Sequence, residues 1–201
     1  ENGQKESEGY LKDDKMVGNT IHRYYSNGQK ESETNYKDGK EDGKKTLWRE
    51  NGQKGSETNY KDGEQDGKVT VWYENGQIMM EENYKDGKKD GKLTTWQKNG
   101  QIQLEINYKD GKYDGKMIDW YKNGQKEYEQ NYKDNKLNGK STFWHENGRK
   151  NSEGKTKDGE REGKWTAWYE SGQKAREVYY KKGKKDGKNT EWHENGKKKN
   201  E

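Results

Sequence analysis

The chain has no cysteine, a single phenylalanine and few leucines, isoleucines and valines among its 201 residues. Without cysteine, neither disulfide bonds nor thiolate metal sites can hold a fold together, and the redox state of its compartment stays open. Hydrophobic residues make up 22% of the chain and charged residues 40%. This composition cannot supply the core of a conventional globular domain, and taken alone it is typical of disorder. The sequence also has no apolar run that would form a signal peptide or a membrane-spanning helix.

The chain also lacks an excess of charge of either sign. Its 42 basic and 38 acidic residues nearly cancel, to a formal net charge of +4, so self-repulsion is weak. Its 8 tryptophans and 15 tyrosines are far more aromatic residues than a solvated tail carries. These two features favour a folded chain over a disordered one.

Most of the tryptophans are spaced 24 residues apart, and Asn-Gly, or once Ser-Gly, follows three residues after each. The series is Trp48, Trp72, Trp96, Trp120, Trp144, Trp168 and Trp192, and Tyr24 holds the preceding position. A strict period of this length indicates a repeat array whose units must stack on one another to bury their apolar faces. We expect a single array over residues 1–201, with units at about 4–28, 29–52, 53–76, 77–100, 101–124, 125–148, 149–172 and 173–196.

Each repeat contains two short segments in which threonine and aromatic residues alternate with polar ones. In residues 29–52 the first segment, Lys30 to Lys37, ends at Asp38-Gly39, and the second opens at Gly43-Lys44 and ends at Trp48. Such runs, bounded by Gly-rich turns, are typical of β-hairpins, and no helical periodicity competes with them. The sequence therefore predicts an all-β fold, an elongated, twisted, single-layer antiparallel meander of about eight 24-residue β-hairpin repeats that forms an open solenoid-like ribbon.

Side-chain parity predicts what each face of the sheet carries. Symmetric pairing across Asp38-Gly39 sets Tyr36 opposite Lys44, Thr34 opposite Thr46 and Ser32 opposite Trp48, which would place the Trp, Tyr, Thr and Lys rows on one face and a Glu row on the other. The faces stay coherent along the array only if the Asn-Gly turn adds a residue, so we predict a bulge with left-handed glycine at Gly52 and its equivalents.

The segment from Tyr36 to Lys44, followed by Trp48 and Asn51-Gly52, resembles the MORN repeat, most closely the bacterial variant grouped with YwqK-like proteins. The resemblance covers almost the whole chain. It implies a chain of β-hairpins with a groove, a role in protein association and scaffolding and, for some bacterial members, a role as antitoxin. Local departures, Asp14 and Asn135 in place of turn glycines and Thr156 in place of a tyrosine, predict weak spots near the first unit and around residues 150–160.

No constellation of residues in the sequence points to catalysis or to a cofactor. The run from Gly39 to Lys44 has one spacer too few for a phosphate loop and leads into a strand instead of a helix. Asp38 and Asp42 match no calcium loop. The three histidines, His22, His145 and His193, are too far apart to form one metal site. We therefore expect a protein that is not an enzyme and that uses no metal and no cofactor.

The central repeats are the most apolar, and their apolar residues are predicted to lie on both faces, more than one layer can hide. This favours binding of another protein, or of a second copy of the chain. The candidate residues are Val69, Val71, Ile78, Met80, Leu93, Trp96, Ile102, Leu104, Ile106, Trp120 and Phe143.

The alternative is a surface or secreted adhesin that binds glycans through exposed Trp and Tyr rings. Interspersed charge argues against nucleic acid, and the lack of a polybasic cluster or an amphipathic helix argues against membranes. Glu1 falls within a repeat and is not a methionine, so both a cytoplasmic and a secreted or cell-surface location stay open, with room for a leader upstream.

Overall fold

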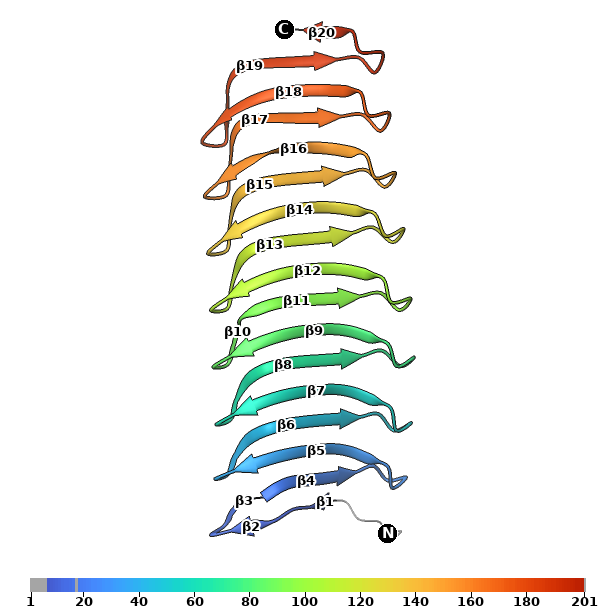
Figure 1. The fold of residues 1–201 in the computed structure, drawn as a ribbon, viewed down its shortest axis with the longest axis vertical. Coiled ribbons are helices and arrows are strands. Elements are labelled where there is room, and N and C mark those ends of the chain that lie inside the picture. Colours follow the sequence, from blue (N-terminus) through green and yellow to red (C-terminus); the bar gives the residue numbers. More distant parts are fainter. Residues whose placement is uncertain (1–6, 17, 201) are drawn as a thin grey trace. The chain divides into compact units, whose positions relative to one another are not determined.

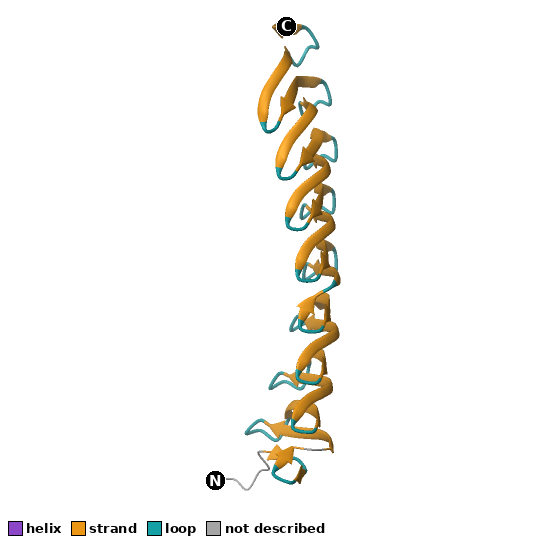
Figure 2. Cartoon of the chain, turned by 90° about the vertical axis from the view of Figure 1, so that its left-hand side faces the viewer, coloured by secondary structure: helices purple, strands orange, loops and turns teal. Residues whose placement is uncertain are grey.

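The computed structural model describes residues 7–16 and 18–200. Every secondary-structure element among these residues is a β-strand (Figure 1). Figure 2, coloured by secondary structure, shows strands and loops alone. Among the described residues, no helix of the length and apolarity needed to cross a bilayer is found. The chain divides into two compact units, Glu1–Gln101 and Ile102–Glu201, called here the N-terminal and the C-terminal unit. The predicted all-β class is confirmed.

The N-terminal unit is an antiparallel meander of hairpins. Its main strands are β4 (Gly18–Tyr24), β5 (Lys30–Lys37), β6 (Lys40–Trp48), β7 (Lys54–Lys61), β8 (Glu64–Trp72) and β9 (Ile78–Lys85), each paired with the next, and β9 also pairs with β10 (Lys88–Lys89) and β11 (Gly91–Trp96). At its start, β1 (Ser7–Glu8) pairs with β4, while β2 (Leu11–Lys12) and β3 (Lys15–Met16) form a separate two-stranded sheet.

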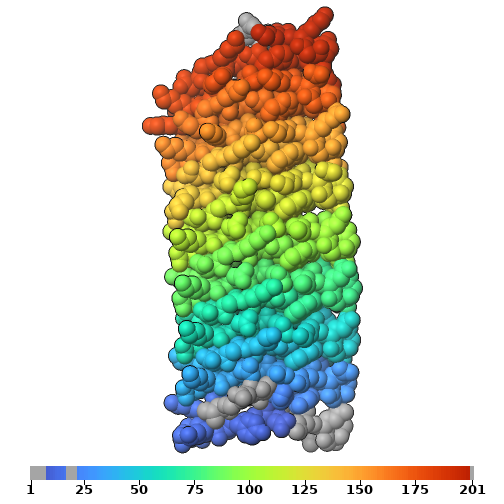
Figure 3. Space-filling view, viewed as in Figure 1, coloured from blue at the N-terminus to red at the C-terminus, as the bar shows by residue number. Residues whose placement is uncertain are grey.

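The C-terminal unit repeats the same arrangement. It contains β12 (Ile102–Lys109), β13 (Lys112–Trp120), β14 (Lys126–Lys133), β15 (Lys136–Trp144), β16 (Lys150–Lys157), β17 (Glu160–Trp168), β18 (Lys174–Lys181), β19 (Lys184–Trp192) and β20 (Lys198–Asn200), each paired antiparallel with the next. Within each unit the predicted single-layer antiparallel meander is therefore confirmed. In the space-filling view the side chains lie in slanted rows along the strands (Figure 3).

The Asp-Gly turn sets the register of the hairpin, and the predicted register is wrong, by three residues next to the turn, where Tyr36 lies opposite Glu41, and by one residue beyond the bulge. Asp38 and Gly39 both adopt left-handed backbone conformations, with φ of 50° and 80°, as a tight two-residue turn requires. Lys37 therefore lies opposite Lys40, and beyond a bulge near Gly43 Thr34 lies opposite Lys45, not Thr46. Symmetric pairing failed because it placed the centre of the hairpin beyond the turn.

This one-residue shift moves the side chains of the second strand to the opposite face, so the predicted division of rows is corrected. The face called here the tryptophan face carries the Trp row together with the Thr46, Lys44 and Glu33 rows, because Glu33 lies opposite Thr46. The tyrosine face carries the Tyr36 row. Tyr60, a member of this row, lies opposite Gly43 and Gln65, and Thr58, two residues earlier on the same face, lies opposite Lys45 and Val69. The Trp and Tyr rows thus lie on different faces.

The Asn-Gly loop contains the left-handed glycine that the sequence predicts. Gly52 has φ of 80°, and its N–H donates to the Arg49 carbonyl at 2.8 Å. The Arg49 N–H donates to the Gln53 carbonyl at 2.8 Å, which closes a three-residue loop. The equivalents of Gly52 behave alike, so the predicted bulge is confirmed. A further register shift at Leu47 and Trp48, next to Gly55, was not predicted.

The central apolar residues lie on both faces, as predicted, but most of them, Met80 included, gather on the tyrosine face, whereas Ile78 lies on the tryptophan face. In the N-terminal unit Val69, Val71 and Met80 share this face, because Val71 lies opposite Met80. Val69 and Leu93 are each only 6% exposed, and in the C-terminal unit Ile106 is 5% exposed. The centre of the tryptophan face is buried too, by a threonine row: Thr46, Thr70, Thr94, Thr142, Thr166 and Thr190. A single layer is thus covered on both sides by its own side chains.

The departures from the repeat pattern are accommodated locally. Asp14 and Asn135 take left-handed conformations with φ of 58° and 67° in place of glycine, as their short polar side chains allow. Where Thr156 replaces a tyrosine, the Trp165 ring is buried and its Nε1–H donates to the Lys155 carbonyl at 3.0 Å. The ring lies directly over Gly154, where a Cβ would collide with it. A buried ring therefore lies in the region in which the sequence predicts a weak spot. The stability of this region stays a prediction.

We expect Gly154→Ala to lower the free energy of unfolding by about 1–3 kcal/mol, because the added methyl must displace the Trp165 ring. Gly55→Ala is the matched control, since its added Cβ meets only ordinary contacts at 3.5 and 3.8 Å. Urea unfolding followed by far-UV circular dichroism measures both. Equal unfolding midpoints for the two variants would contradict this packing.

Candidate binding hollow on the tyrosine face

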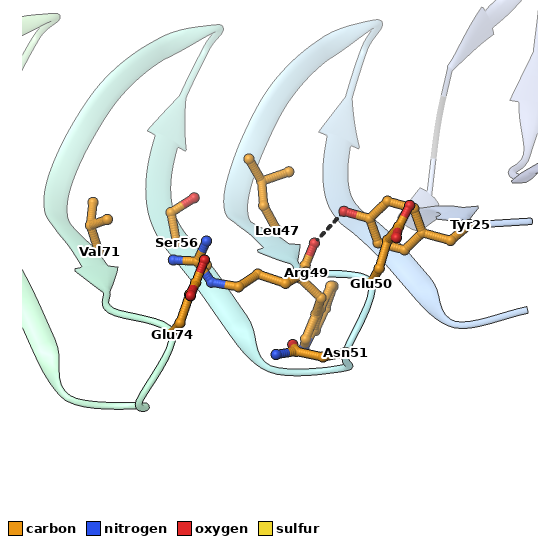
Figure 4. Close-up of a pocket in the computed structure, with 10 residues that line it drawn as sticks. Tyr25, Leu47, Arg49, Glu50, Asn51, Ser56, Val71 and Glu74 are labelled. Carbon is orange, nitrogen blue, oxygen red and sulfur yellow. Dashed lines mark hydrogen bonds between the residues drawn. The ribbon is translucent and has the colours of Figure 1, made fainter. Parts of the chain in front are cut away.

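A hollow of about 760 Å³ lies on the tyrosine face of the N-terminal unit, at the end of the strands where the Asn-Gly loops are. Leu47, Ser56 and Val71 come from three successive strands, β6, β7 and β8 (Figure 4). Three successive loops complete the lining with Tyr25, Arg49, Glu50, Asn51 and Glu74, together with Trp48 at the end of β6 and Gly55 in β7. Apolar side chains thus line the floor, and charged side chains stand at the loops.

Small residues create the hollow. Gly55 and Ser56 occupy places in their repeat that Met79 and Met80 fill one repeat later. Leu47, opposite Ser56 in the sheet, is left 40% exposed. A second hollow of about 250 Å³ adjoins Leu47 from the other side and has Ser32, Thr34 and Tyr36 in its lining. Leu47 therefore stands between two hollows of the same face.

The walls of the larger hollow belong to a row of side chains that bind one repeat to the next. The Tyr25 hydroxyl donates to the Trp48 carbonyl at 2.7 Å, a contact that spans 23 residues. Equivalent contacts lead from Tyr73, Tyr121 and Tyr169 to Trp96, Trp144 and Trp192, and a ring nitrogen of His145 lies 3.1 Å from the Trp168 carbonyl. We call these residues the staples. Sequence reasoning missed them, although their spacing follows the tryptophan period.

Arg49 is the charged member among these staples, and it lines the hollow. Its Nη2 donates to the Trp72 carbonyl at 2.6 Å, while its buried Nε has no hydrogen-bond partner among the described residues. Glu50 and Glu74, in the loops beside it, form no ion pair among the described residues. The rim therefore carries one cation, already bound to a backbone carbonyl, and two carboxylates without an ion pair among the described residues.

The tryptophan face differs, because its charges are paired. Glu129 accepts from Lys116 at 3.0 Å and from Lys126 at 2.7 Å, and Glu57, Glu153 and Glu177 are held in the same way by two lysines each. The hydrogen bond from Lys126, opposed by partial burial and reinforced by Lys116, lowers the pKa of Glu129 below its usual range. This face therefore presents no unbalanced row of charge.

The Trp rings of this face lie beneath lysine ammonium groups. Lys54 Nζ lies 5.8 Å from the centroid of Trp72, and Lys30, Lys126, Lys150 and Lys174 lie 5.2–5.8 Å from Trp48, Trp144, Trp168 and Trp192. Each contact is worth about 0.5–1 kcal/mol at such exposed sites. The cover does not come from the Lys44 row, which binds the glutamates. Ile78 and Ile102 stand where this lysine stands in the other repeats.

The structure disperses the residues predicted to bind a partner. Val71 lines the hollow, and Met80 shares its face. Val69, Leu93 and Ile106 are buried, so they support the sheet and are not available to a partner. Ile78 lies opposite Trp72 and on the same face as Trp96. In the C-terminal unit, Leu104 and Phe143 lie on the tyrosine face. Ile102 and Trp120 lie on the tryptophan face. The signal that could have located the hollow is the change from Ser32 and Ser56 to Met80 at one repeat position.

Nothing in the described part of the chain resembles a catalytic or metal centre. No group of three or more His, Cys, Asp or Glu side chains among these residues is placed to hold an ion. The most buried carboxylate, Glu82, accepts from the Tyr84 hydroxyl at 2.9 Å and pairs with Lys89 at 2.7 Å. Burial, together with Glu82, raises the pKa of Tyr84 to about 12. This cluster is internally paired and leaves no group free to act on a substrate.

A single-layer array of hairpins with an open, partly apolar face is the architecture of a repeat binding module. The family described as MORN repeat variant matches residues 23–38, 65–86, 89–110, 113–134 and 161–182, which together make up just over half of the chain. The chain belongs to this family. MORN repeats generally bind proteins or membranes and are not typically catalytic. A search of curated proteins found no sequence that matches the chain.

We expect Tyr73→Phe to lower the free energy of unfolding by about 0.5–1.5 kcal/mol, because the Trp96 carbonyl loses its donor at 2.7 Å. Tyr179→Phe is the control, since Tyr179 is 42% exposed. Hydrogen exchange read out by mass spectrometry should show the loss of protection in the loops around Tyr73 and Trp96. An unchanged exchange pattern in Tyr73→Phe would mean that the staples contribute nothing to cohesion between repeats.

The paired glutamates predict a loss of stability in acid. Their folded pKa values are lowered, so their stabilising contribution is present above the ordinary glutamate pKa of 4.5 and is lost as pH falls through the lowered values. Between about pH 5 and pH 3 we expect these pairs to account for about 1–2 kcal/mol of lost stability. Replacing Glu57, Glu129, Glu153 and Glu177 by Gln should flatten this dependence.

The matched control replaces the same number of loop glutamates, Glu50, Glu74, Glu146 and Glu170, by Gln. None of these four forms an ion pair among the residues that the structure describes. Urea unfolding at pH 3, 4, 5 and 7 compares the two variants. If both show the same acid sensitivity as the parent protein, the strand ion pairs do not stabilise the fold.

Proposed function

We propose that this protein is a non-catalytic scaffold that holds another protein against the tyrosine face of its N-terminal unit. The observation that carries the proposal is the hollow between Tyr25 and Glu74, with Leu47 40% exposed beside it. A partly apolar concave surface bounded by polar loops is the usual form of a binding site. The family supports the coarser part of the proposal, that the chain is a binding repeat without catalytic activity.

The hollow suits a protein segment better than the central apolar residues do. Val69, Leu93 and Ile106, proposed from the sequence, are buried by their own neighbours and cannot anchor a partner. Leu47, Ser56 and Val71 lie one after another across three strands, which offers a row of contacts to an extended chain. Binding of a second copy of the protein is one form of this proposal.

The glycan-binding alternative receives less support from the geometry. Saccharides would stack on open aromatic faces, but five of the repeat tryptophans lie beneath lysine ammonium groups. In the repeats of Trp96 and Trp120, isoleucine replaces that lysine. These two are therefore the repeat tryptophans on which a saccharide could still stack.

An antitoxin or immunity role is a more specific form of the proposal. Its support is the resemblance to YwqK-like proteins. In that case the partner in the hollow would be a toxin, and a toxin gene beside the gene for this protein would strengthen the idea.

Ser56→Met tests the scaffold, because Met80 occupies the same place one repeat later and the fold should accept it. The added side chain fills the hollow, so we expect a partner captured by the parent protein to be reduced at least about tenfold in quantitative pull-downs. A loss of this size corresponds to about 1.4 kcal/mol. Ser152→Met, at the equivalent place in the C-terminal unit, is the matched control and should capture the partner as the parent does. Capture of the same partner by Ser56→Met at the parent level would overturn the proposal.

A further inference from the structure

The carboxylates at the rim of the hollow differ from the strand carboxylates of the tryptophan face. Glutamates on the tryptophan face, such as Glu57 and Glu129, are each held by two lysines. Glu50 and Glu74 line the hollow and form no ion pair among the residues described. In a chain whose charges nearly cancel, unpaired carboxylates beside an apolar floor leave a local negative charge.

Arg49 neutralises only one side of the hollow. Its guanidinium is bound to the Trp72 carbonyl and, in Figure 4, lies beside Ser56 and Glu74, well away from Tyr25. The Glu50 carboxylate stands at the other side, where Tyr25 also lines the hollow (Figure 4). The Tyr25 ring is fixed there by the hydrogen bond of its hydroxyl to Trp48. The side formed by Tyr25, Glu50 and Leu47 therefore keeps an unbalanced carboxylate next to an aromatic ring and an exposed aliphatic side chain.

The same pairing of a staple tyrosine with the acid of the next loop recurs in the C-terminal unit. There Tyr121 donates to the Trp144 carbonyl at 2.8 Å. Partial burial, together with the charges of Glu127 and Glu146, raises the pKa of Tyr121. Glu146, which holds the repeat position of Glu50, thus lies close enough to Tyr121 to act on it electrostatically.

We infer that the Tyr25–Glu50–Leu47 corner receives a lysine or arginine side chain of the partner protein, an inference that rests on the scaffold function proposed above. The methylene stem lies on Leu47, the cationic head faces the Tyr25 ring, and Glu50 supplies the opposite charge. An acidic side chain is excluded from this corner, because Glu50 would repel it. The partner segment is therefore basic at the point where it enters the hollow.

Three capped heptapeptides, Ala-Val-Ser-X-Ser-Val-Ala with lysine, norleucine or glutamate at X, test this inference. Titrated into the ¹⁵N-labelled full chain, the lysine peptide should shift the amide resonances of residues 47–56 and bind about three- to tenfold more tightly than the norleucine peptide. The glutamate peptide should bind more weakly than both. Raising the salt concentration should reduce the advantage of lysine.

Glu50→Gln should bring the lysine peptide to the affinity of the norleucine peptide. Glu170→Gln is the matched control, because it changes the same loop position in a repeat whose preceding staple is His145. Tyr25→Phe should retain the preference for lysine, since the ring remains, and Tyr25→Leu should lose it. Tyr73→Leu, which removes a staple before a loop that carries Lys98, controls for the loss of the hydrogen bond.

Equal binding of the three peptides at residues 47–56 would leave the hollow as a peptide site and refute the preference for a basic side chain. The preference for a basic side chain is also refuted if Glu50→Gln leaves the lysine advantage unchanged, or if no peptide shifts these amides. The scaffold function itself fails on a different result, the unchanged capture of the partner by Ser56→Met. The two experiments therefore separate the inference from the function on which it rests.

Discussion

The two-residue Asp-Gly turn is the constraint on which the rest of the structure depends. Because Asp38 and Gly39 both take left-handed conformations, Lys37 must lie opposite Lys40, and the strands pair with an odd offset. A side-chain period of two converts that offset into a choice of face. The Asn-Gly loop with left-handed Gly52 preserves the choice in the next hairpin. Two turn types thus decide which residues meet in every repeat.

The two faces that result solve different problems. On the tryptophan face, threonines form the centre, and glutamates and lysines neutralise one another around it. This arrangement stabilises a thin sheet without a second layer and leaves little that would attract a charged partner. On the tyrosine face, a thin apolar centre such as Val69 and Leu93 is buried, but Gly55 and Ser56 leave room near the loops. The paired charges and the open space are therefore found on opposite sides of one layer.

The sequence was sufficient for the repeat, the hairpins and the left-handed glycine, because each depends on local turn chemistry and on a strict period. It was insufficient for the register, because the Gly-rich segment from Asp38 to Gly43 does not itself show where the hairpin is centred or that a bulge follows the turn. Trp165 shows a second limit: its ring compensates for Thr156 from the neighbouring strand, a relation that no local pattern encodes. The hollow was missed for a third reason. It is produced by the space that Ser56 does not fill, whereas the sequence signal of a binding surface is the presence of large apolar residues.

The staples have a consequence for how such a gene can change. Each contact joins a side chain to a carbonyl 23 residues ahead, so insertion or loss of one whole repeat recreates the same bond at the new junction. An array of this kind can therefore lengthen or shorten by recombination and still fold. The hollow has no such freedom, since its lining combines Tyr25 from the loop after β4, Ser56 from β7 and Glu74 from the loop after β8. The number of repeats can therefore change, whereas selection for binding would preserve the order of these particular repeats.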